Sequence, residues 1–277
     1  MVKQYKLALI TGGSSGIGLA LASELASEGT NICMLARDEG KLELAKSELS
    51  KLTLEPSQTV QYLVCDVTNY DCVNTKITQF IQENGLPDLV INSAGVTYPG
   101  YFQDLDVDIF HWLMDINYYG TMHIVKVVIP GMIERGSGTI LNISSQAGFA
   151  GVFGYSGYSA SKYAVRGFSD VIRAELKPLG IQVSVAFPPD TDTPQLAFEE
   201  PLKPYETRII AGATKEKPAK DVADDILKAM KKGKYIIIPG FDGKFFYHLV
   251  NLAGNLLYPL MDILVRIAQK KKNKEIQ

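Results

Sequence analysis

Short apolar segments alternate with longer amphipathic segments along most of this chain. Many of the apolar runs have hardly a polar residue, as expected for strands that are covered on both faces. These runs predict strands at 7–10, 31–35, 60–65, 89–91, 139–143, 183–187 and 235–238. The periodicity between them predicts helices over about 16–28, 39–52, 69–84, 106–133, 157–178 and 219–232. The alternation predicts an α/β fold with a doubly wound parallel sheet of about seven strands.

Two segments depart from this alternation. The stretch 188–218 is rich in proline, threonine and charge, and it is too long for a plain connection. We expect it to cover a substrate rather than to link two domains. From residue 241 an apolar segment, 245–261, precedes a group of basic residues. The chain therefore divides into one domain, 1–240, and a C-terminal apolar and basic appendage, 241–277.

The appendage has features of a membrane-proximal segment. Its apolar part is slightly shorter than the roughly 20 residues that a helix needs to cross a bilayer, and Asp262 and Arg266 interrupt its extension. Its aromatic residues suit a membrane interface, and the lysines that follow suit anionic headgroups. We expect peripheral membrane contact without a clear span. Packing on the domain or an oligomer contact is the alternative.

Composition narrows the class of protein. The 277 residues are 46% hydrophobic and 21% charged, which is typical of a globular chain with a sizeable core. A net charge of −2 argues against a dedicated nucleic-acid binder. Cys33, Cys65 and Cys72 are too few and too scattered for a disulfide framework or a metal cluster. The apolar run 7–10 is too short for a signal peptide. These features favour a cytoplasmic protein, and the appendage favours the cytosolic face of a membrane.

A glycine-rich loop, TGGSSGIG at 11–18, joins the first predicted strand to the first predicted helix. Glycines let the backbone approach a pyrophosphate closely, and a helix N-terminus offers unpaired N–H groups and a positive dipole. The alternative is a strand-to-helix turn that merely needs glycine. The candidate cofactor-binding residues of this loop are Gly12, Ser14, Ser15, Gly16, Ile17 and Gly18.

The same loop also contains the G-x-S-x-G pattern of a hydrolase nucleophile elbow. Such an elbow usually follows several strands and precedes its acid and histidine, whereas this loop follows the first strand. Of the three histidines, His111 and His123 lie in a long helical pattern. Chain order therefore favours dinucleotide binding over hydrolysis.

The end of the second predicted strand favours NADPH over NADH. A site for NADH usually has an acidic residue there, which binds the ribose 2′-OH. This chain has Arg37, with Lys41 four positions further on, and two cations suit an added 2′-phosphate. Asp66, after the third strand, is placed to accept a hydrogen bond from the adenine amino group or to cap a helix. Asn92 and the residues after it close the fourth strand, where they support or line the cofactor crevice.

The helix predicted from 157 begins with a pair of residues suited to proton transfer. Tyr158 and Lys162 are four positions apart and share a helical face. An adjacent ammonium stabilises a phenolate and lowers the pKa of the phenol, which can then exchange a proton with a carbonyl or alcohol oxygen. Ser145, just after the fifth strand, can hydrogen-bond the reacting oxygen. Asn117 is isolated in the preceding helix, where it serves the site or is a plain polar residue.

These motifs, in this order and spacing, resemble the short-chain dehydrogenase/reductase family over about residues 5–240. The resemblance rests on TGGSSGIG, NSAG at 92–95, Asn117, Ser145 and YSASK at 158–162. It implies a Rossmann-like fold that binds a dinucleotide. It also implies a dimer or tetramer built on the helices around 106–133 and 157–178.

The resemblance also implies a role for each catalytic residue. Tyr158 is the proton donor and acceptor, and Lys162 lowers its pKa and holds the nicotinamide ribose. Ser145 orients the carbonyl group, and Asn117 anchors a water that relays protons. No metal is implied.

One segment narrows the resemblance. Most family members carry Pro-Gly after the sixth strand, whereas this chain has PPDTDTP at 188–194. This segment, KPYETR at 203–208 and SSQAG at 144–148 are similar to the 3-ketodihydrosphingosine reductases, which reduce a long-chain 3-keto sphingoid base with NADPH. We therefore expect a reductase of a long-chain lipid ketone in sphingolipid metabolism. The alternatives are a reductase of another lipophilic ketone, such as a steroid or 3-oxoacyl compound, and a non-catalytic dinucleotide-binding protein.

Overall fold

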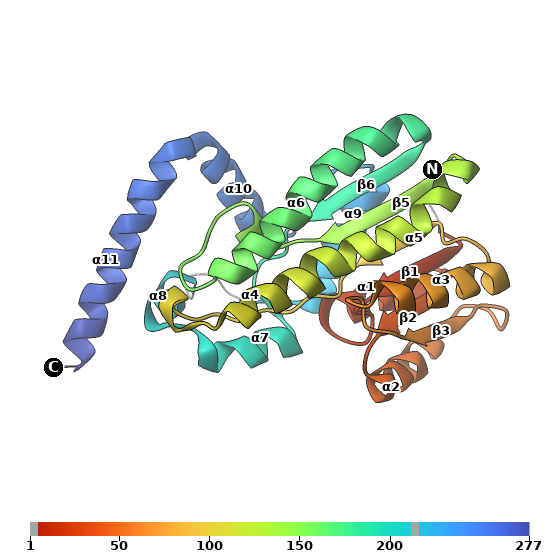
Figure 1. Ribbon diagram of the computed structural model, residues 1–277, viewed down its shortest axis with the longest axis horizontal. Helices are drawn as coiled ribbons and strands as arrows, with labels where there is room; N and C mark the ends of the chain where they lie inside the picture. Colours follow the sequence, from red (N-terminus) through yellow and green to blue (C-terminus); the bar gives the residue numbers. More distant parts are fainter. Residues whose placement is uncertain (1–4, 212–215, 277) are drawn as a thin grey trace.

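The computed structural model describes residues 5–211 and 216–276, in which a twisted parallel sheet lies between two layers of helices (Figure 1). The sheet has seven strands in the order β3-β2-β1-β4-β5-β6-β9, and every neighbouring pair is parallel. The strands are β1 (Leu7–Thr11), β2 (Asn31–Ala36), β3 (Val60–Val64), β4 (Leu89–Asn92), β5 (Gly138–Ile143), β6 (Ile181–Ala186) and β9 (Ile236–Ile237). The predicted α/β fold and all seven predicted strands are confirmed.

Helices cover both faces of the sheet, which explains why its strands are apolar almost throughout. Neighbouring side chains of a strand point to opposite faces. Leu9 and Ile10 are both fully buried, and they belong to two separate hydrophobic clusters. The cluster of Ile10 is closed by α1 (Gly16–Ser27), α2 (Glu39–Ser50) and α9 (Ala219–Lys231). The cluster of Leu9 is closed by α3 (Tyr70–Asn84), α5 (Gly120–Arg135) and α6 (Ser156–Leu176).

The long helix predicted over 106–133 consists of three segments. A π-helical turn, Asp115–Tyr119, separates α4 (Val107–Met114) from α5. A π-helical turn accommodates one extra residue per turn and is frequent at functional sites. The turn contains Asn117, which the sequence singled out.

The segment 188–218 contains helices that its proline-rich composition did not predict. It forms α7 (Pro194–Glu199) and α8 (Tyr205–Ala211), flanked by the two-residue strands β7 (Thr191–Asp192) and β8 (Lys217–Pro218). Thr193 starts α7, because its hydroxyl accepts a hydrogen bond from the Leu196 N–H at 3.3 Å.

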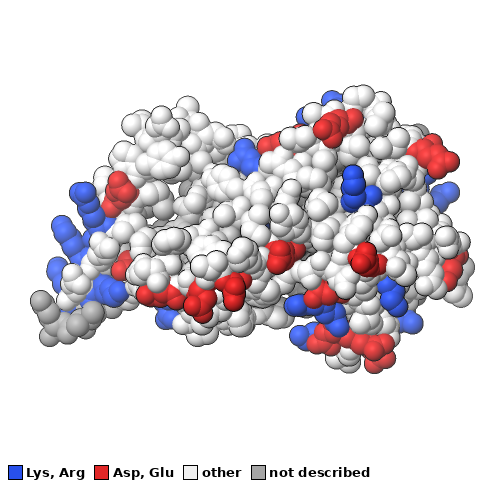
Figure 2. Space-filling view, viewed as in Figure 1, with Lys and Arg blue, Asp and Glu red and all other residues white. Residues whose placement is uncertain are grey.

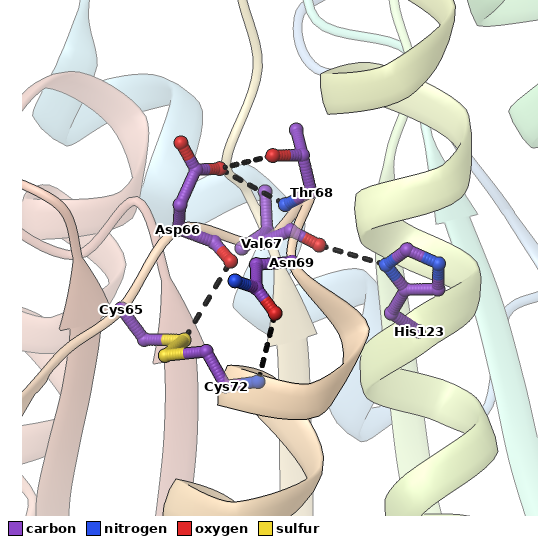
Figure 3. Close-up of a disulfide and its surroundings, with 7 residues drawn as sticks. All are labelled: Cys65, Asp66, Val67, Thr68, Asn69, Cys72 and His123. Atoms are coloured by element: carbon purple, nitrogen blue, oxygen red, sulfur yellow. Dashed lines mark hydrogen bonds between the residues drawn. A yellow bond between two sulfur atoms is a disulfide. The ribbon is translucent and has the colours of Figure 1, made fainter.

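Cys65 and Cys72 form a disulfide (Figure 3), a pair that their spacing in the sequence did not predict. The chain reverses between them, because Asp66 accepts hydrogen bonds from Thr68 and Asn69 caps α3 by accepting one from the Cys72 N–H. This turn brings the two cysteine Cα atoms to 6.2 Å. The disulfide depends on a reversal of the chain between Cys65 and Cys72, which the positions of the cysteines in the sequence do not reveal.

The appendage forms two helices, α10 (Phe241–Ala253) and α11 (Leu257–Ile276), which meet at an angle (Figure 1). Gly254, with a φ of +50°, lies between them. By length and composition alone, the helical segment Phe241–Lys274 suffices to cross a membrane, and its apolar window is not buried against the domain. The expectation of peripheral membrane contact without a clear span stays a prediction.

Both ends of the appendage also pack on the domain. In α10, Phe246 and Tyr247 contact Phe149, with ring centroids 5.6 and 5.1 Å apart. In α11, the Lys272 ammonium donates a hydrogen bond to the Tyr101 hydroxyl at 2.8 Å and lies 3.5 Å from a Glu206 carboxylate oxygen. The two helices therefore have a fixed position relative to the sheet.

Candidate active site

A pocket of about 470 Å³ opens at the carboxyl ends of the central strands. Its lining includes residues that follow β1, β4, β5 and β6, together with the start of α1 and residues of α6, α7, α10 and α11. Ligands of open parallel sheets bind at this edge. The segment 188–218, expected to cover a substrate, forms one wall.

Tyr158, Ser145 and Lys162 converge in this pocket. Tyr158 and Lys162 lie in the first two turns of α6 and are only 9% and 5% exposed. The Ser145 hydroxyl is close to the Tyr158 phenol, and hydrogen bonding between the two acts to lower the pKa of the phenol. The Lys162 ammonium lies 5.7 Å from the centre of the phenol ring and donates a hydrogen bond to the Ile143 carbonyl oxygen at 3.1 Å. The structure thus brings Tyr158 and Lys162 of α6 together with Ser145, which follows β5.

The electrostatics of Tyr158 differ from the sequence-based expectation. Burial raises the pKa of the Tyr158 phenol, and its hydrogen bond with Ser145 offsets only part of that rise. Burial also lowers the pKa of the Lys162 ammonium to about 8. Desolvation of the phenol thus outweighs the lowering of its pKa that was expected from the Lys162 ammonium. A phenol with a raised pKa is protonated at neutral pH, which is the state that a proton donor needs.

Asn117 lies beside Lys162 and holds the chain that follows β4. Its side chain is 1% exposed; Oδ1 accepts a hydrogen bond from the Val96 N–H at 2.8 Å, and Nδ2 donates one to Ser161 Oγ at 2.9 Å. A Cβ placed on Gly95 would lie 3.1 Å from Asn117 Oδ1 and 3.2 Å from Lys162 Nζ. The plain-helix alternative for Asn117 does not account for these contacts. Its role in anchoring a water stays a prediction.

The glycine loop forms a cradle that suits a pyrophosphate. Gly12 and Gly16 have φ values of +65° and +53°, which favour glycine. A Cβ on Gly12 would lie 2.8 Å from the Ala94 N, and one on Gly18 would overlap the Gly12 carbonyl. Side chains would therefore disrupt the loop at the N-terminus of α1. Five predicted residues of the loop line the pocket: Gly12, Ser15, Gly16, Ile17 and Gly18.

The other predicted cofactor residues are not among the described residues that line the pocket; they are Ser14, Arg37, Lys41, Asp66 and Asn92. Arg37 Nη1 lies 3.5 Å from Asp66 Oδ2, and the Arg37 side chain is 58% exposed. Lys41 pairs instead with Asp38 at 3.6 Å. Arg37 and Asp66 thus meet beyond the ends of β2 and β3, where both remain accessible to a ligand.

Asn92 supports the crevice from within the sheet. Its Nδ2 donates a hydrogen bond to Asn142 Oδ1 at 2.8 Å, and Asn142 Nδ2 donates one to Ser169 Oγ at 2.9 Å. These buried bonds connect β4, β5 and α6. Asn92 therefore helps to hold together the elements that position Ser145, Tyr158 and Lys162.

Sequence reasoning missed two carboxylates in the pocket wall, Asp190 and Glu199. Both raise the pKa of the Tyr158 phenol electrostatically. The Tyr155 hydroxyl donates a hydrogen bond to Glu199 Oε1 at 2.9 Å. The PPDTDTP sequence, where most family members have Pro-Gly, was a signal for Asp190. Glu199 gave no signal, because it lies among other charged residues in a segment expected to be a loop.

Comparison with known proteins places these features in a family. The short chain dehydrogenase family model matches residues 6–201. A 3-ketodihydrosphingosine reductase of Bos taurus is 42% identical over 262 residues, which cover 94% of this chain and 78% of that protein. A 3-dehydrosphinganine reductase of Danio rerio is 40% identical over 236 residues, covering 85% and 71%.

Solved structures agree on the fold. A short-chain dehydrogenase/reductase from Burkholderia phymatum in complex with NAD has a TM-score of 0.80 at 24% identity, with 93% of this chain and 96% of that chain covered. A short-chain dehydrogenase from Sphingobium yanoikuyae in complex with NADPH has a TM-score of 0.76 at 26% identity, with 92% and 95% covered. The two structures hold different dinucleotides.

Proposed function

This chain belongs to the short-chain dehydrogenase/reductase family, and we propose that it reduces the 3-keto group of 3-ketodihydrosphingosine to give dihydrosphingosine, with NADPH as the hydride donor. The carrying observation is the convergence of Tyr158, Ser145 and Lys162 in a pocket, in a chain 42% identical to a reductase named for this substrate. Because a non-catalytic dinucleotide-binding protein needs no proton donor, the complete set favours an enzyme.

Each of these pocket residues has its own role in the reduction of a carbonyl group. The nicotinamide supplies hydride to the carbonyl carbon when it is bound. Ser145 and Tyr158, which lie close together in the pocket, are placed to hold the carbonyl oxygen jointly. Tyr158 then transfers its phenol proton to that oxygen, which completes the alcohol. Lys162, fixed on the Ile143 carbonyl, supplies positive charge as the phenolate forms.

Arg37 and Lys41 support NADPH as the cofactor. Two cations follow β2, where NAD enzymes usually have a carboxylate. Arg37 is paired with Asp66 at 3.5 Å, and a 2′-phosphate would compete for the same guanidinium. Because a phosphate monoester carries more negative charge than a carboxylate, the exchange favours the phosphate. Asp66 would then be free to accept a hydrogen bond from the adenine amino group.

The appendage, 241–277, supports contact with the cytosolic face of a membrane. α10 begins at Phe241, the proposed start of this unit. The exposed residues of the appendage include large apolar side chains, such as Leu252, which is 87% exposed, and Leu256. Basic side chains gather over α11 (Figure 2). Met261 and Leu264 of α11 also line the pocket, so the surface proposed to meet lipid continues into the site.

An oligomer built on α4, α5 and α6 remains part of the proposal. Exposed apolar residues on these elements support it; they are Val107, Ile133, Tyr163 and Val171. The mass of the purified protein in solution tests the assembly.

The function is tested by NADPH oxidation with the purified full chain. The substrates are 3-ketodihydrosphingosine, a panel of steroid ketones and 3-oxoacyl thioesters. We expect the highest kcat/KM with 3-ketodihydrosphingosine. Faster turnover of a steroid or a thioester would assign the enzyme to another lipophilic ketone.

A further inference from the structure

The wall of the pocket that faces Tyr158 carries an excess of negative charge. Asp190 follows β6, and Glu199 ends α7. Both line the pocket, and both are close enough to Tyr158 to raise the pKa of its phenol. A reductase of a neutral ketone has no evident use for two carboxylates beside its proton donor.

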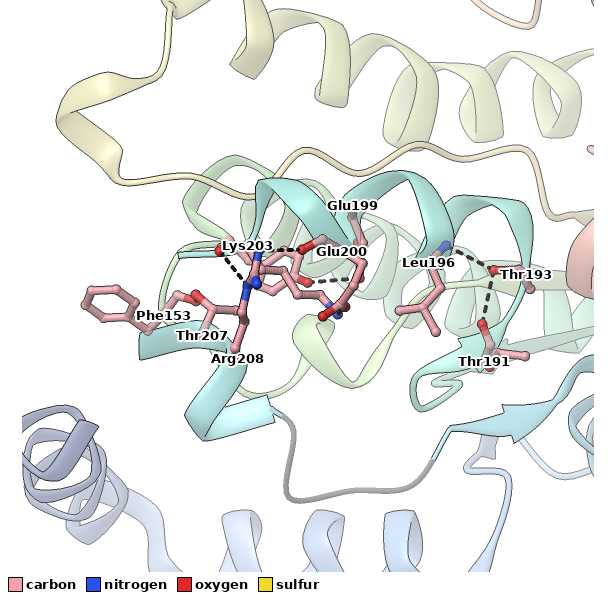
Figure 4. Close-up of polar contacts among 10 residues, drawn as sticks. Phe153, Thr191, Thr193, Leu196, Glu199, Glu200, Lys203, Thr207 and Arg208 are labelled. Carbon is pink, nitrogen blue, oxygen red and sulfur yellow. Dashed lines mark hydrogen bonds and ion pairs between the residues drawn. The ribbon is translucent and has the colours of Figure 1, made fainter. Parts of the chain in front are cut away.

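Lysines offset part of this charge. Lys162 and Lys217 line the pocket, but within residues 5–211 and 216–276 neither forms an ion pair, whereas Lys203 pairs with Glu199. The Lys203 ammonium lies 3.5 Å from Glu199 Oε1 and 2.6 Å from Glu200 Oε2 (Figure 4). Lys203 and Glu199 are both buried, whereas Glu200 is exposed. Lys203 therefore serves two carboxylates at once. The Tyr155 hydroxyl adds a hydrogen bond to Glu199 but no charge.

Asp190 lacks a comparable partner. Within residues 5–211 and 216–276, its carboxylate makes no hydrogen bond or ion pair, although its main-chain carbonyl accepts one from the Lys217 N–H at 3.0 Å. Burial raises the pKa of the Asp190 carboxyl, and the distant Lys203 charge counteracts it. The Asp190 side chain is half-buried, and a cationic ligand group would stabilise a partly desolvated carboxylate that has no partner.

The proposed substrate carries such a group. In 3-ketodihydrosphingosine the carbon next to the ketone bears an ammonium. Tyr158 and Ser145 fix the position of the ketone oxygen independently of the carboxylates. Because the ammonium is bonded to the carbon next to the carbonyl carbon, it must lie in the same part of the pocket as the carbonyl group.

Resting on the proposed function, we propose that Asp190, assisted by Glu199, binds the ammonium group of the substrate and thereby selects 2-amino ketones. The ammonium would supply the positive partner that the Asp190 carboxylate lacks, while Lys203 stays paired with Glu199 and Glu200. The aliphatic chain would leave toward Phe246 of α10 and toward Met261 and Leu264 of α11, which also line the pocket. Asp190 and Glu199 are thus specificity-determining residues rather than proton donors.

The test compares two substrates, 3-ketodihydrosphingosine and its 2-deamino analogue, which has hydrogen in place of the ammonium. A hydrogen bond between charged groups contributes enough for a preference of about 10- to 100-fold in kcat/KM. In Asp190→Asn the preference should fall to near 1, and in Glu199→Gln it should fall by less. The matched control is Asp192→Asn, an exposed residue of the same segment, which should keep the wild-type preference.

Each result bears on the proposal. A wild-type enzyme that reduces both substrates equally well would overturn it without any variant, as would an Asp190→Asn enzyme that keeps the wild-type preference. An equal loss on both substrates would show a structural role and reject the selection. If the wild-type enzyme reduces the analogue but not 3-ketodihydrosphingosine, the proposed function fails as well. NADPH binding by each variant, measured by cofactor fluorescence, verifies that it is folded.

Discussion

Lys162 of α6 donates a hydrogen bond to the main-chain carbonyl of Ile143, the last residue of β5, at 3.1 Å. A second bond, from the Ser144 hydroxyl to the Lys162 carbonyl oxygen at 2.9 Å, runs in the opposite direction. These two bonds fix the register between helix and strand. Tyr158 and Ser145, which lie on different elements, therefore meet at a defined position.

Tyr158→Phe should lower kcat by about 10²- to 10⁴-fold, which is the range for the loss of a general acid. The ring would still pack against Tyr155, whose centroid is 5.7 Å away, so NADPH binding should persist. Steady-state NADPH oxidation measures the effect. Tyr163→Phe, on an exposed part of the same helix, is the control. Near wild-type turnover in folded Tyr158→Phe would disprove the assignment.

Arg37→Ala should weaken NADPH binding by about 10- to 100-fold and NADH binding by much less, because only NADPH carries the 2′-phosphate. Titration of cofactor fluorescence gives both dissociation constants. Lys46→Ala, in the helix α2 that follows Arg37, is the control. An equal loss of affinity for the two cofactors would mean that Arg37 does not bind the 2′-phosphate.

The buried Lys162 should make stability rise with pH. Its pKa is about 8 in the folded protein and 10.5 in its ordinary state, so between these values the unfolded chain binds more protons than the folded one. The free energy of unfolding then increases with pH across that window. Denaturant unfolding at several pH values measures the slope. Lys162→Met should lose this part of the slope, and the same slope in both proteins would contradict the assignment.

Replacing Leu252 and Leu256 together by Asp should reduce co-sedimentation of the full chain with anionic liposomes, because both side chains are large, apolar and exposed. Leu54→Asp, an equally apolar exposed site on the domain, should leave pelleting unchanged. Pelleting of wild type and the double variant to the same extent would argue that α10 and α11 serve as packing elements.

Much of the architecture follows from local patterns. A strand that is covered on both faces must be apolar throughout, so β1 to β6 could be located from the sequence. The glycine loop follows from chain geometry, because Gly12 and Gly16 adopt positive φ values that favour glycine. The shared face of Tyr158 and Lys162 follows from the pitch of a helix.

Other features depend on groups that are far apart in the sequence. The direction of the Tyr158 pKa is set by burial, and burial is decided by every element that packs around the phenol. Asp190 and Glu199 reach the pocket because the chain folds back into short helices that its composition did not predict. Local spacing fixes which side chains share a face, whereas desolvation and charge balance are properties of the closed pocket. The sequence by itself therefore determined the fold and the shared helical face of Tyr158 and Lys162, and only the tertiary structure decided the electrostatics of the two side chains.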